Sequence, residues 1–145
     1  MLKNLDSDYF FVVGYAGSGK STYAKMLAVS LNANFIEASD IVKKVSKLQT
    51  RSDLASKTAD LDQAIIEELR KVEKPAVVSG VRQVSILQAF EGNPIIWLSV
   101  PFEKREDRLT RRGSTKDNIS LKEADDLDNK LGVGEVLNYI KDYHN

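Results

Sequence analysis

The sequence predicts an α/β fold in which a parallel sheet carries helices on both faces. Short apolar runs that are typical of buried strands alternate with longer segments of helical apolar spacing. The first run, Tyr9 to Val13, leads through a glycine-rich stretch into a segment from Ser21 to Leu31 with helical spacing. At 145 residues the chain fits a single domain over 1–145.

The remaining elements continue this alternation. A second strand is expected over 34–40, ending at Asp40, and a helix from Ile41 to about Leu48. Next come a helix over 61–72, a strand over 75–79, a helix over 84–90, a strand over 94–100 and a helix over 103–112. A polar segment over 113–120 then leads into helical or mixed sequence up to Asn145.

Composition narrows the class of protein. The formal net charge is zero and the pI is about 6.6, which argues against a nucleic-acid or membrane surface. The sequence contains no cysteine, which excludes disulfides and thiolate metal sites. There is no long apolar run and no signal peptide at the N-terminus, so we expect a cytoplasmic protein.

The stretch Gly14-Tyr-Ala-Gly-Ser-Gly-Lys20-Ser21 fits the spacing G-x-x-x-x-G-K-[ST]. Such a loop turns its backbone N–H groups inward at a polyphosphate, and the helix behind it adds a positive end. Lys20 would reach the β- and γ-phosphates of ATP and Ser21 would ligate Mg²⁺. The predicted phosphate-binding residues are Gly14, Ala16, Gly17, Ser18, Gly19, Lys20, Ser21 and Thr22.

Two classes of nucleotide hydrolase fit poorly. Motor-type ATPases carry an acid at the end of an apolar strand, but the strand Ala76 to Ser79 ends in serine. GTPases carry [NT]-K-x-D, which Asn129-Lys-Leu-Gly132 does not match. A small-molecule kinase remains, in which arginines surround the loop and grip phosphates. Arginines in the regions expected at this rim are Arg51, Arg82, Arg105, Arg108, Arg111 and Arg112.

Several of these residues allow a structural interpretation as well. Arg105, Arg108 and Arg112 form one helical stripe, which either binds phosphate or is a solvated face paired with nearby acids. Arg82 could be an ordinary surface arginine. Asp40 could cap the helix that begins at Ile41. Tyr9 and Trp97 are expected in the core rather than as base-stacking platforms.

The chain resembles the nucleoside monophosphate kinase-like group of P-loop kinases. This group includes adenylate kinases, phage deoxynucleoside monophosphate kinases, animal-type phosphomevalonate kinase and dephospho-CoA-kinase-like proteins. The resemblance rests on the glycine loop, Ala38-Ser-Asp-Ile41, Val77-Val-Ser-Gly-Val-Arg82, the segment Val100 to Arg112, and Leu131-Gly-Val-Gly-Glu-Val136.

This resemblance implies a three-layer P-loop NTPase fold with sheet order 2-3-1-4 and usually a fifth strand. It also implies an acceptor-binding region over about 40–72 and a short lid over about 108–128. Acceptor phosphate would lie near Asp40, Arg51 and Arg82, and Ser21 and Asp40 would organise Mg²⁺. Arg108 would lie against the adenine and Arg112 against the transferring phosphates, so the implied catalytic residues are Lys20, Arg82, Arg108 and Arg112.

The sequence departs from this family in three places. Ser79 stands where many members have aspartate. The segment up to Asn145 leaves little room for both a fifth strand and an adenine-contacting loop. Asp125, Asp126 and Asp128 lie where other members place lid arginines.

We therefore expect an ATP-dependent phosphotransferase acting on a nucleoside or deoxynucleoside monophosphate, with ATP, Mg²⁺ and a small phosphorylated acceptor as its ligands. Two alternatives stay open. One is a kinase of another phosphorylated acceptor, such as phosphomevalonate or dephospho-CoA. The other is a nucleotide-binding module or ATPase without an acceptor.

Overall fold

The computed structural model describes residues 7–46, 59–112 and 120–144. Its strands are β1 (Tyr9–Val13), β2 (Asn34–Glu37), β3 (Ala76–Ser79) and β4 (Ile95–Trp97). Its helices are α1 (Lys20–Leu31), α2 (Ala38–Ser46), α4 (Ala59–Lys71), α5 (Val84–Ala89), α6 (Phe102–Arg112), α7 (Leu121–Leu131) and α8 (Val133–His144). Within the described ranges, no helix is long and apolar enough to cross a membrane.

The four strands form one parallel sheet in the order β2-β3-β1-β4, which confirms the expected arrangement. Strand β1 is central because all five of its residues are apolar or aromatic and buried. Its register with β3 pairs Phe11 with Val78, so apolar side chains stack in rows across the sheet. This stacking fixes where the loop after β1 leaves the sheet.

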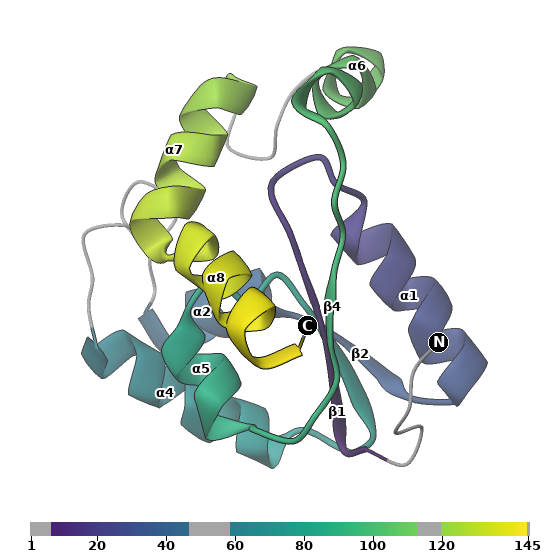
Figure 1. Cartoon of the computed structure of the whole chain (residues 1–145). Coiled ribbons are helices and arrows are strands. Elements are labelled where there is room, and N and C mark those ends of the chain that lie inside the picture. The colour runs from purple at the N-terminus through teal and green to yellow at the C-terminus, as the bar shows by residue number, and fades with distance from the viewer. Residues whose placement is uncertain (1–6, 47–58, 113–119, 145) are drawn as a thin grey trace.

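Helices cover both faces of the sheet and give the three predicted layers (Figure 1). Helix α1 packs on one face through Ala24 and Ala28, against Phe10, Val12 and Val77. On the other face lies the larger core, to which α2, α4, α5 and α8 contribute Val42, Ile65, Leu69, Ile86 and Val136. Alternate residues of β1 thus face opposite layers, as the period of two requires.

Helices α6 and α7 stand beyond the carboxyl ends of the strands (Figure 1). A small apolar cluster of Ala16, Leu109, Leu121 and Ala124 joins both helices to the loop after β1. At the start of α7, the Ser120 hydroxyl accepts from the Glu123 N–H at 3.1 Å and lies 3.1 Å from the Glu123 carboxylate. This N-cap hydrogen bond stabilises the first turn of α7.

Two predicted strand ends were wrong, and the expected helical or mixed sequence near the C-terminus is helical. Strand β2 ends at Glu37 and α2 already begins at Ala38, so Asp40 lies inside the first turn of the helix and does not cap it. Strand β4 is shorter than predicted, because pairing with β1 ends at Trp97. Within the described residues after Gly132 the chain forms the helix α8 and no fifth strand.

Leu69→Ala tests this layered core. The Leu69 side chain is fully buried between α4 and the sheet, so its loss should lower the free energy of unfolding by about 2–5 kcal/mol. Val29→Ala on α1 is the control, because Val29 is 83% exposed and should change stability by less than about 0.5 kcal/mol. Urea unfolding measures both; similar losses in the two variants would contradict this packing.

Candidate active site

The glycine-rich loop leaves the carboxyl end of β1 and curls back over the start of α1. Gly17 and Gly19 have φ angles of 78° and 87°, in the left-handed region that glycine tolerates. Inside the loop, the Ser18 N–H donates to the Tyr15 carbonyl oxygen at 3.2 Å. Helix α1 begins at Lys20, directly behind the loop. The positive end of the helix therefore lies at the loop, where it can stabilise an anion.

The first two residues of α1 point into this region. The Lys20 ammonium donates to the Tyr15 carbonyl oxygen at 3.1 Å, which places its charge across the loop. The Ser21 hydroxyl donates to Glu37 Oε2 at 2.7 Å. A lysine charge, a hydroxyl and a carboxylate thus lie together at the start of the helix.

Glu37 is a site residue that the sequence interpretation missed. It ends β2, opposite Ser79 in the register with β3. It thus lies three residues before Asp40, the carboxylate that the sequence interpretation assigned to Mg²⁺. A Cβ on Gly80 would lie 3.3 Å from Glu37 Oε1, so the absence of a side chain there makes room for this carboxylate. Its position at the end of a strand could have identified Glu37 from the sequence. The prediction that this strand extends to Asp40 placed Glu37 inside the strand instead.

Arg82 follows β3 and is held by an acid from α7. Its Nε donates to Asp128 Oδ1 at 2.9 Å, and the side chain is only 13% exposed. The interpretation of Arg82 as an ordinary surface arginine is therefore wrong. Asp128, 1% exposed, also accepts from the Ala16 N–H through Oδ2 at 3.3 Å. One buried carboxylate thus connects Arg82 to the glycine-rich loop.

Arg105 is buried and ties the loop to α7. Its guanidinium makes a two-pronged pair with Asp125, at 2.8 and 3.0 Å, and donates to the carbonyl oxygens of Ala16 at 3.0 Å and Val100 at 3.1 Å. The same group lies 5.4 Å from the centre of the Tyr15 ring. Arg105 therefore holds the shape of the loop from behind.

The other arginines of α6 differ from Arg105. The exposed Arg108 donates from a terminal nitrogen to the Gly17 carbonyl oxygen at 3.2 Å. Arg111 forms a solvated pair with Asp107 at 3.0 Å, four residues away. The predicted stripe is thus divided, because Arg105 is buried and Arg108 lies at the loop. Arg111, which lies outside this stripe, forms the solvated ion pair.

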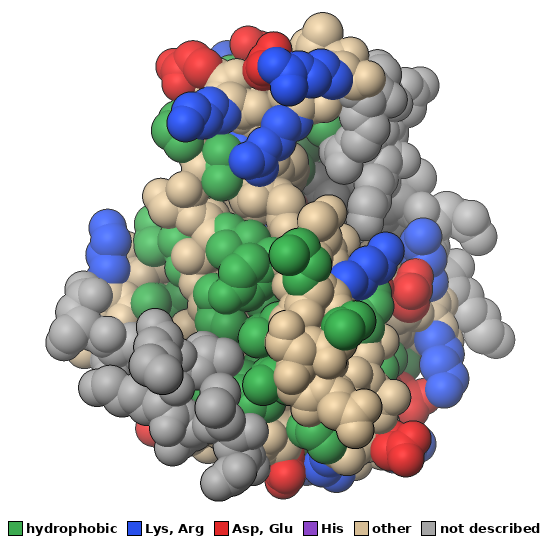
Figure 2. Space-filling model, turned by 90° about the vertical axis from the view of Figure 1, so that its right-hand side faces the viewer, with side chains coloured by type: hydrophobic (Ala, Val, Ile, Leu, Met, Phe, Trp, Pro, Cys, Tyr) green, Lys and Arg blue, Asp and Glu red, His purple; other side chains and the backbone are tan. Residues whose placement is uncertain are grey.

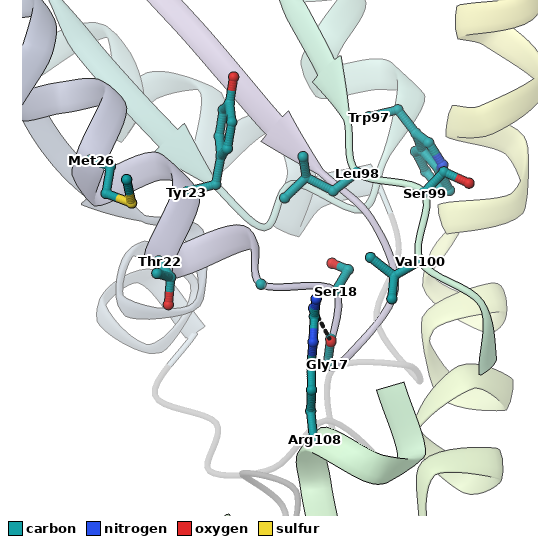
Figure 3. Close-up of a pocket in the computed structure, with 11 residues that line it drawn as sticks. Gly17, Ser18, Thr22, Tyr23, Met26, Trp97, Leu98, Ser99, Val100 and Arg108 are labelled. Atoms are coloured by element: carbon teal, nitrogen blue, oxygen red, sulfur yellow. Dashed lines mark hydrogen bonds between the residues drawn. The ribbon is translucent and has the colours of Figure 1, made fainter. Parts of the chain in front are cut away.

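A cavity of about 600 Å³ opens between the loop, α1 and the end of β4. Figure 3 shows Arg108 reaching from α6 to Gly17, with Leu98 directed toward Tyr23 and Val100 beside Ser18. The cavity is lined by Gly17, Ser18, Gly19, Thr22, Tyr23, Met26, Trp97, Leu98, Ser99, Val100 and Arg108. It combines loop backbone with aromatic and aliphatic walls, a lining suited to a ligand with an anionic end and a flat apolar end.

Figure 2 shows the molecular face that carries α1, with hydrophobic side chains gathered at its centre and Lys and Arg side chains above them, near α6. Tyr23 and Met26, which line the cavity, are 39% and 67% exposed.

Trp97 packs against the main core, as predicted, and also lines the cavity. Tyr9 is a core residue, as predicted.

Burial raises the pKa of the Tyr15 phenol, and the negative charges of Asp125 and Asp128 raise it further. The phenol therefore stays protonated at neutral pH. It donates to Asn129 Oδ1 at 2.7 Å, which adds a further link between the loop and α7.

The remaining predicted residues lie as follows. Gly14 begins the loop, and a Cβ there would lie 2.9 Å from Ser18 Oγ. Asp40 is exposed in the first turn of α2. Arg112 ends α6 with a side chain outside the described residues, and Arg51 lies outside them altogether. The hydroxyls of Ser18 and Ser79 are buried without a hydrogen-bond partner in the part of the chain that the structure describes.

Comparison with known proteins places this chain in a family. A family model described as an AAA domain matches residues 11–129. The cytidylate kinase of Haloarcula marismortui is 28% identical over 92% of this chain and 70% of its own length. The cytidylate kinase of Ignicoccus hospitalis is 30% identical over 78% of this chain and 67% of its own length. The chain belongs to the P-loop kinase family.

Other members of this P-loop kinase family have different names. The shikimate kinase of Microcystis aeruginosa is 27% identical over 83% of this chain and 65% of its own length. The structure of the shikimate kinase from Acinetobacter baumannii, in complex with shikimate, superposes with a TM-score of 0.61 at 17% identity. It covers 95% of this chain and 78% of its own. These comparisons support a kinase that uses ATP and leave the acceptor open.

Gly17→Ala tests the shape of the P-loop. The new methyl group would lie 3.2 Å from Arg105 Cβ, and the positive φ of 78° adds strain. Gly92→Ala is the matched control, because it has a φ of 96° and open space around it. Both should lose about 1–2 kcal/mol of stability from the backbone term. Only Gly17→Ala should weaken ATP binding, which calorimetry measures. Each ~1.4 kcal/mol of binding free energy lost corresponds to about a tenfold higher Kd. Equal ATP affinity in the two variants would contradict a role of Gly17 in shaping the phosphate-binding loop.

Proposed function

We propose that this P-loop kinase transfers the γ-phosphoryl group of ATP to a nucleoside or deoxynucleoside monophosphate. The observation that carries the proposal is the gathering of cationic groups at the loop. Lys20 and Arg108 contact the loop backbone at Tyr15 and Gly17, and Arg82 follows the adjacent strand β3. The similarity to two cytidylate kinases supports the choice of acceptor.

In the proposed reaction an oxygen of the acceptor phosphate attacks the γ-phosphorus in line. The bond between this phosphorus and the bridging β–γ oxygen breaks, and ADP leaves with the electron pair. The loop N–H groups and Lys20 hold the β- and γ-phosphates, while Arg82 holds the acceptor phosphate. Arg108 and Arg112 are proposed to stabilise charge on the transferring group. Such positioning and charge neutralisation account for most of the catalysis of phosphoryl transfer.

The nucleotide would occupy the cavity beside the loop. Its triphosphate would lie on the loop backbone at the start of α1 beside Arg108, and its base would lie against the apolar wall formed by Tyr23, Met26 and Leu98. We propose this pose because the anionic and apolar requirements of ATP match the two ends of the cavity.

The residues around Ser21 also fit a magnesium ion. Hydroxyl and carboxylate oxygens are its preferred protein ligands, and Ser21 Oγ and Glu37 Oε2 lie 2.7 Å apart. A bound Mg²⁺ would neutralise charge on the ATP phosphates. The described residues contain no group of three or more His, Cys, Asp or Glu side chains able to hold a metal, so the phosphates and water would complete its coordination. We propose Glu37 for this role in place of Asp40, which is exposed on α2; Asp40 and Arg51 remain proposed acceptor contacts.

A second candidate function is phosphoryl transfer to a small hydroxylated carboxylic acid. The similarity in sequence to a shikimate kinase favours it, because shikimate kinases are named for such an acceptor. Arg82 would then hold the carboxylate of the acceptor, a group that a guanidinium binds in the same two-pronged way as phosphate. The two candidates differ only in the acceptor.

An acceptor screen separates these candidates. ADP release is measured with each ribonucleoside and deoxyribonucleoside monophosphate, mevalonate phosphate, dephospho-CoA and shikimate. We expect turnover with CMP or dCMP. Turnover with shikimate alone would establish the second candidate, and hydrolysis of ATP that no acceptor accelerates would overturn both in favour of an acceptor-free ATPase.

Lys20→Ala should lower turnover by about two to three orders of magnitude, because an ammonium that neutralises developing charge is lost from a preorganised site. Lys25→Ala is the control, since Lys25 is an exposed lysine one turn further along α1. Steady-state kinetics and far-UV circular dichroism are measured on both. Near-normal turnover of a folded Lys20→Ala variant would remove Lys20 from the mechanism.

The two candidate carboxylates for magnesium can be tested against each other. Glu37→Gln keeps the shape of the side chain and removes its charge, so the Mg²⁺ concentration for half-maximal activity should rise about tenfold, which corresponds to ~1.4 kcal/mol. Asp40→Asn should leave this concentration unchanged. The reverse result would return the metal site to Asp40.

A further inference from the structure

Helix α7 turns two carboxylates, Asp125 and Asp128, toward the P-loop. They are three residues apart and therefore share one face of the helix. Asp125 binds Arg105, which in turn donates to the Ala16 carbonyl oxygen. Asp128 accepts directly from the Ala16 N–H. The N–H and the carbonyl oxygen of Ala16 are therefore both linked to α7. Asp128, which accepts from the N–H, also binds Arg82.

The Asp128 side chain hydrogen-bonds to both the P-loop backbone and Arg82. Oδ2 accepts from Ala16 N–H at 3.3 Å and Oδ1 accepts from Arg82 Nε at 2.9 Å. The carboxylate is 1% exposed. A charge so fully removed from water interacts strongly with its partners and is costly to leave unpaired.

The geometry around this carboxylate limits its movement. Gly132, which caps the end of α7, lies so close to Arg82 that a Cβ there would be 2.8 Å from the Arg82 carbonyl oxygen. At the other end of α7, Leu121 and Ala124 pack against Ala16 and Leu109. Helix α7 is thus packed against both the loop and Arg82. A movement of α7 at one of these contacts therefore changes the other.

A guanidinium has five N–H donors in a fixed plane. In Arg82, Nε donates to Asp128, so the carboxylate orients the plane of the guanidinium. The two terminal nitrogens lie in the same plane, so their orientation is set as well. The direction in which Arg82 can meet an anion is therefore set by α7.

We propose that Asp128 is a positioning residue that orients Arg82 toward the acceptor anion and couples acceptor binding to the P-loop through the Ala16 amide. This proposal rests on the proposed function, in which Arg82 meets the acceptor phosphate. Because coupling free energies are reciprocal, an ATP analogue bound at the loop should strengthen acceptor binding, and the acceptor should strengthen binding of the analogue by the same factor.

The test measures this coupling in Asp128→Asn, which keeps the size of the side chain and removes the charge. Titration calorimetry gives the Kd of CMP with and without a non-hydrolysable ATP analogue, and the ratio of the two values is the coupling factor. We expect a wild-type factor of about 5–150 and a value near one in Asp128→Asn. Asp126→Asn is the control, because Asp126 is exposed on the same helix and should keep the wild-type factor.

A structural role alone would give a different result. If Asp128 only stabilises the fold, Asp128→Asn lowers the melting temperature and leaves the coupling factor at its wild-type value, which overturns the proposal. If its charge only neutralises Arg82, the variant binds CMP more tightly, which also overturns it. In an Arg82→Ala background, Asp128→Asn should cause no further loss of CMP affinity, since its effect on the acceptor passes through Arg82.

A second measurement needs no variant at Asp128. Hydrogen exchange of the Ala16 amide in the wild-type protein should slow when CMP alone is added, because the acceptor reaches this N–H only through Arg82 and Asp128. Unchanged exchange at saturating CMP would overturn the coupling. If the wild-type protein binds no nucleoside monophosphate, the proposed function fails first, and the same exchange measurement with shikimate decides whether the coupling holds for the second candidate.

Discussion

The buried guanidinium of Arg105 is the contact on which the geometry of the site depends. It meets a carboxylate on α7, the carbonyl oxygen of Ala16 in the P-loop and that of Val100 after β4. Three segments far apart in the sequence converge on one side chain. Removing one partner of such a buried pair typically costs about 3–5 kcal/mol, because the other charge is left unpaired in a poorly solvated place. The curl of the P-loop is therefore maintained by α6 and α7 as well as by its own glycines.

This dependence explains the absence of side chains at Gly17. A Cβ there would meet Arg105 Cβ at 3.2 Å and its carbonyl oxygen at 3.4 Å. Glycine at this position thus meets two requirements at once, the positive φ of the turn and the close approach of the α6 backbone. At Gly19 the closest approach is Arg108, whose terminal nitrogen would lie 3.4 Å from a Cβ. The loop is confined on its outer side by the helix that supplies two of its arginine contacts.

The sequence predicted the sheet, its flanking helices and the position of the P-loop because these depend on local patterns. An apolar run such as Tyr9 to Val13 forms a strand wherever it is covered, and the glycine spacing sets the turn that follows it. The end of β2 was harder to place, because Ala38 and Ser39 are compatible with either a strand or a helix. Only the register of Glu37 with Ser79 places the carboxylate beside Ser21.

Arginine partners could not be predicted, because pairing across 20 to 46 residues is set by how the elements pack. Helix spacing put Arg105 and Arg108 on one stripe, yet Asp125 binds the first and a main-chain carbonyl binds the second. In the sequence, Asp125 and Asp128 are departures from a family pattern that places arginines in the lid. In the structure they are the partners of Arg105 and Arg82, and both pairs are linked to the loop at Ala16.

These pairings divide the arginines into two kinds. Arg82 and Arg105 each face a full negative charge, so their own charge is largely offset and their orientation is fixed. Arg108 contacts a carbonyl dipole instead, which orients it weakly and leaves more of its charge to act on a neighbouring anion. A site can thus contain fixed and adjustable cations around one phosphate chain, and the difference follows from what each guanidinium touches.

In a chain of zero net charge, attraction of a nucleotide cannot come from the overall field. It must arise locally, from the loop amides, the start of α1 and the cations beside the loop.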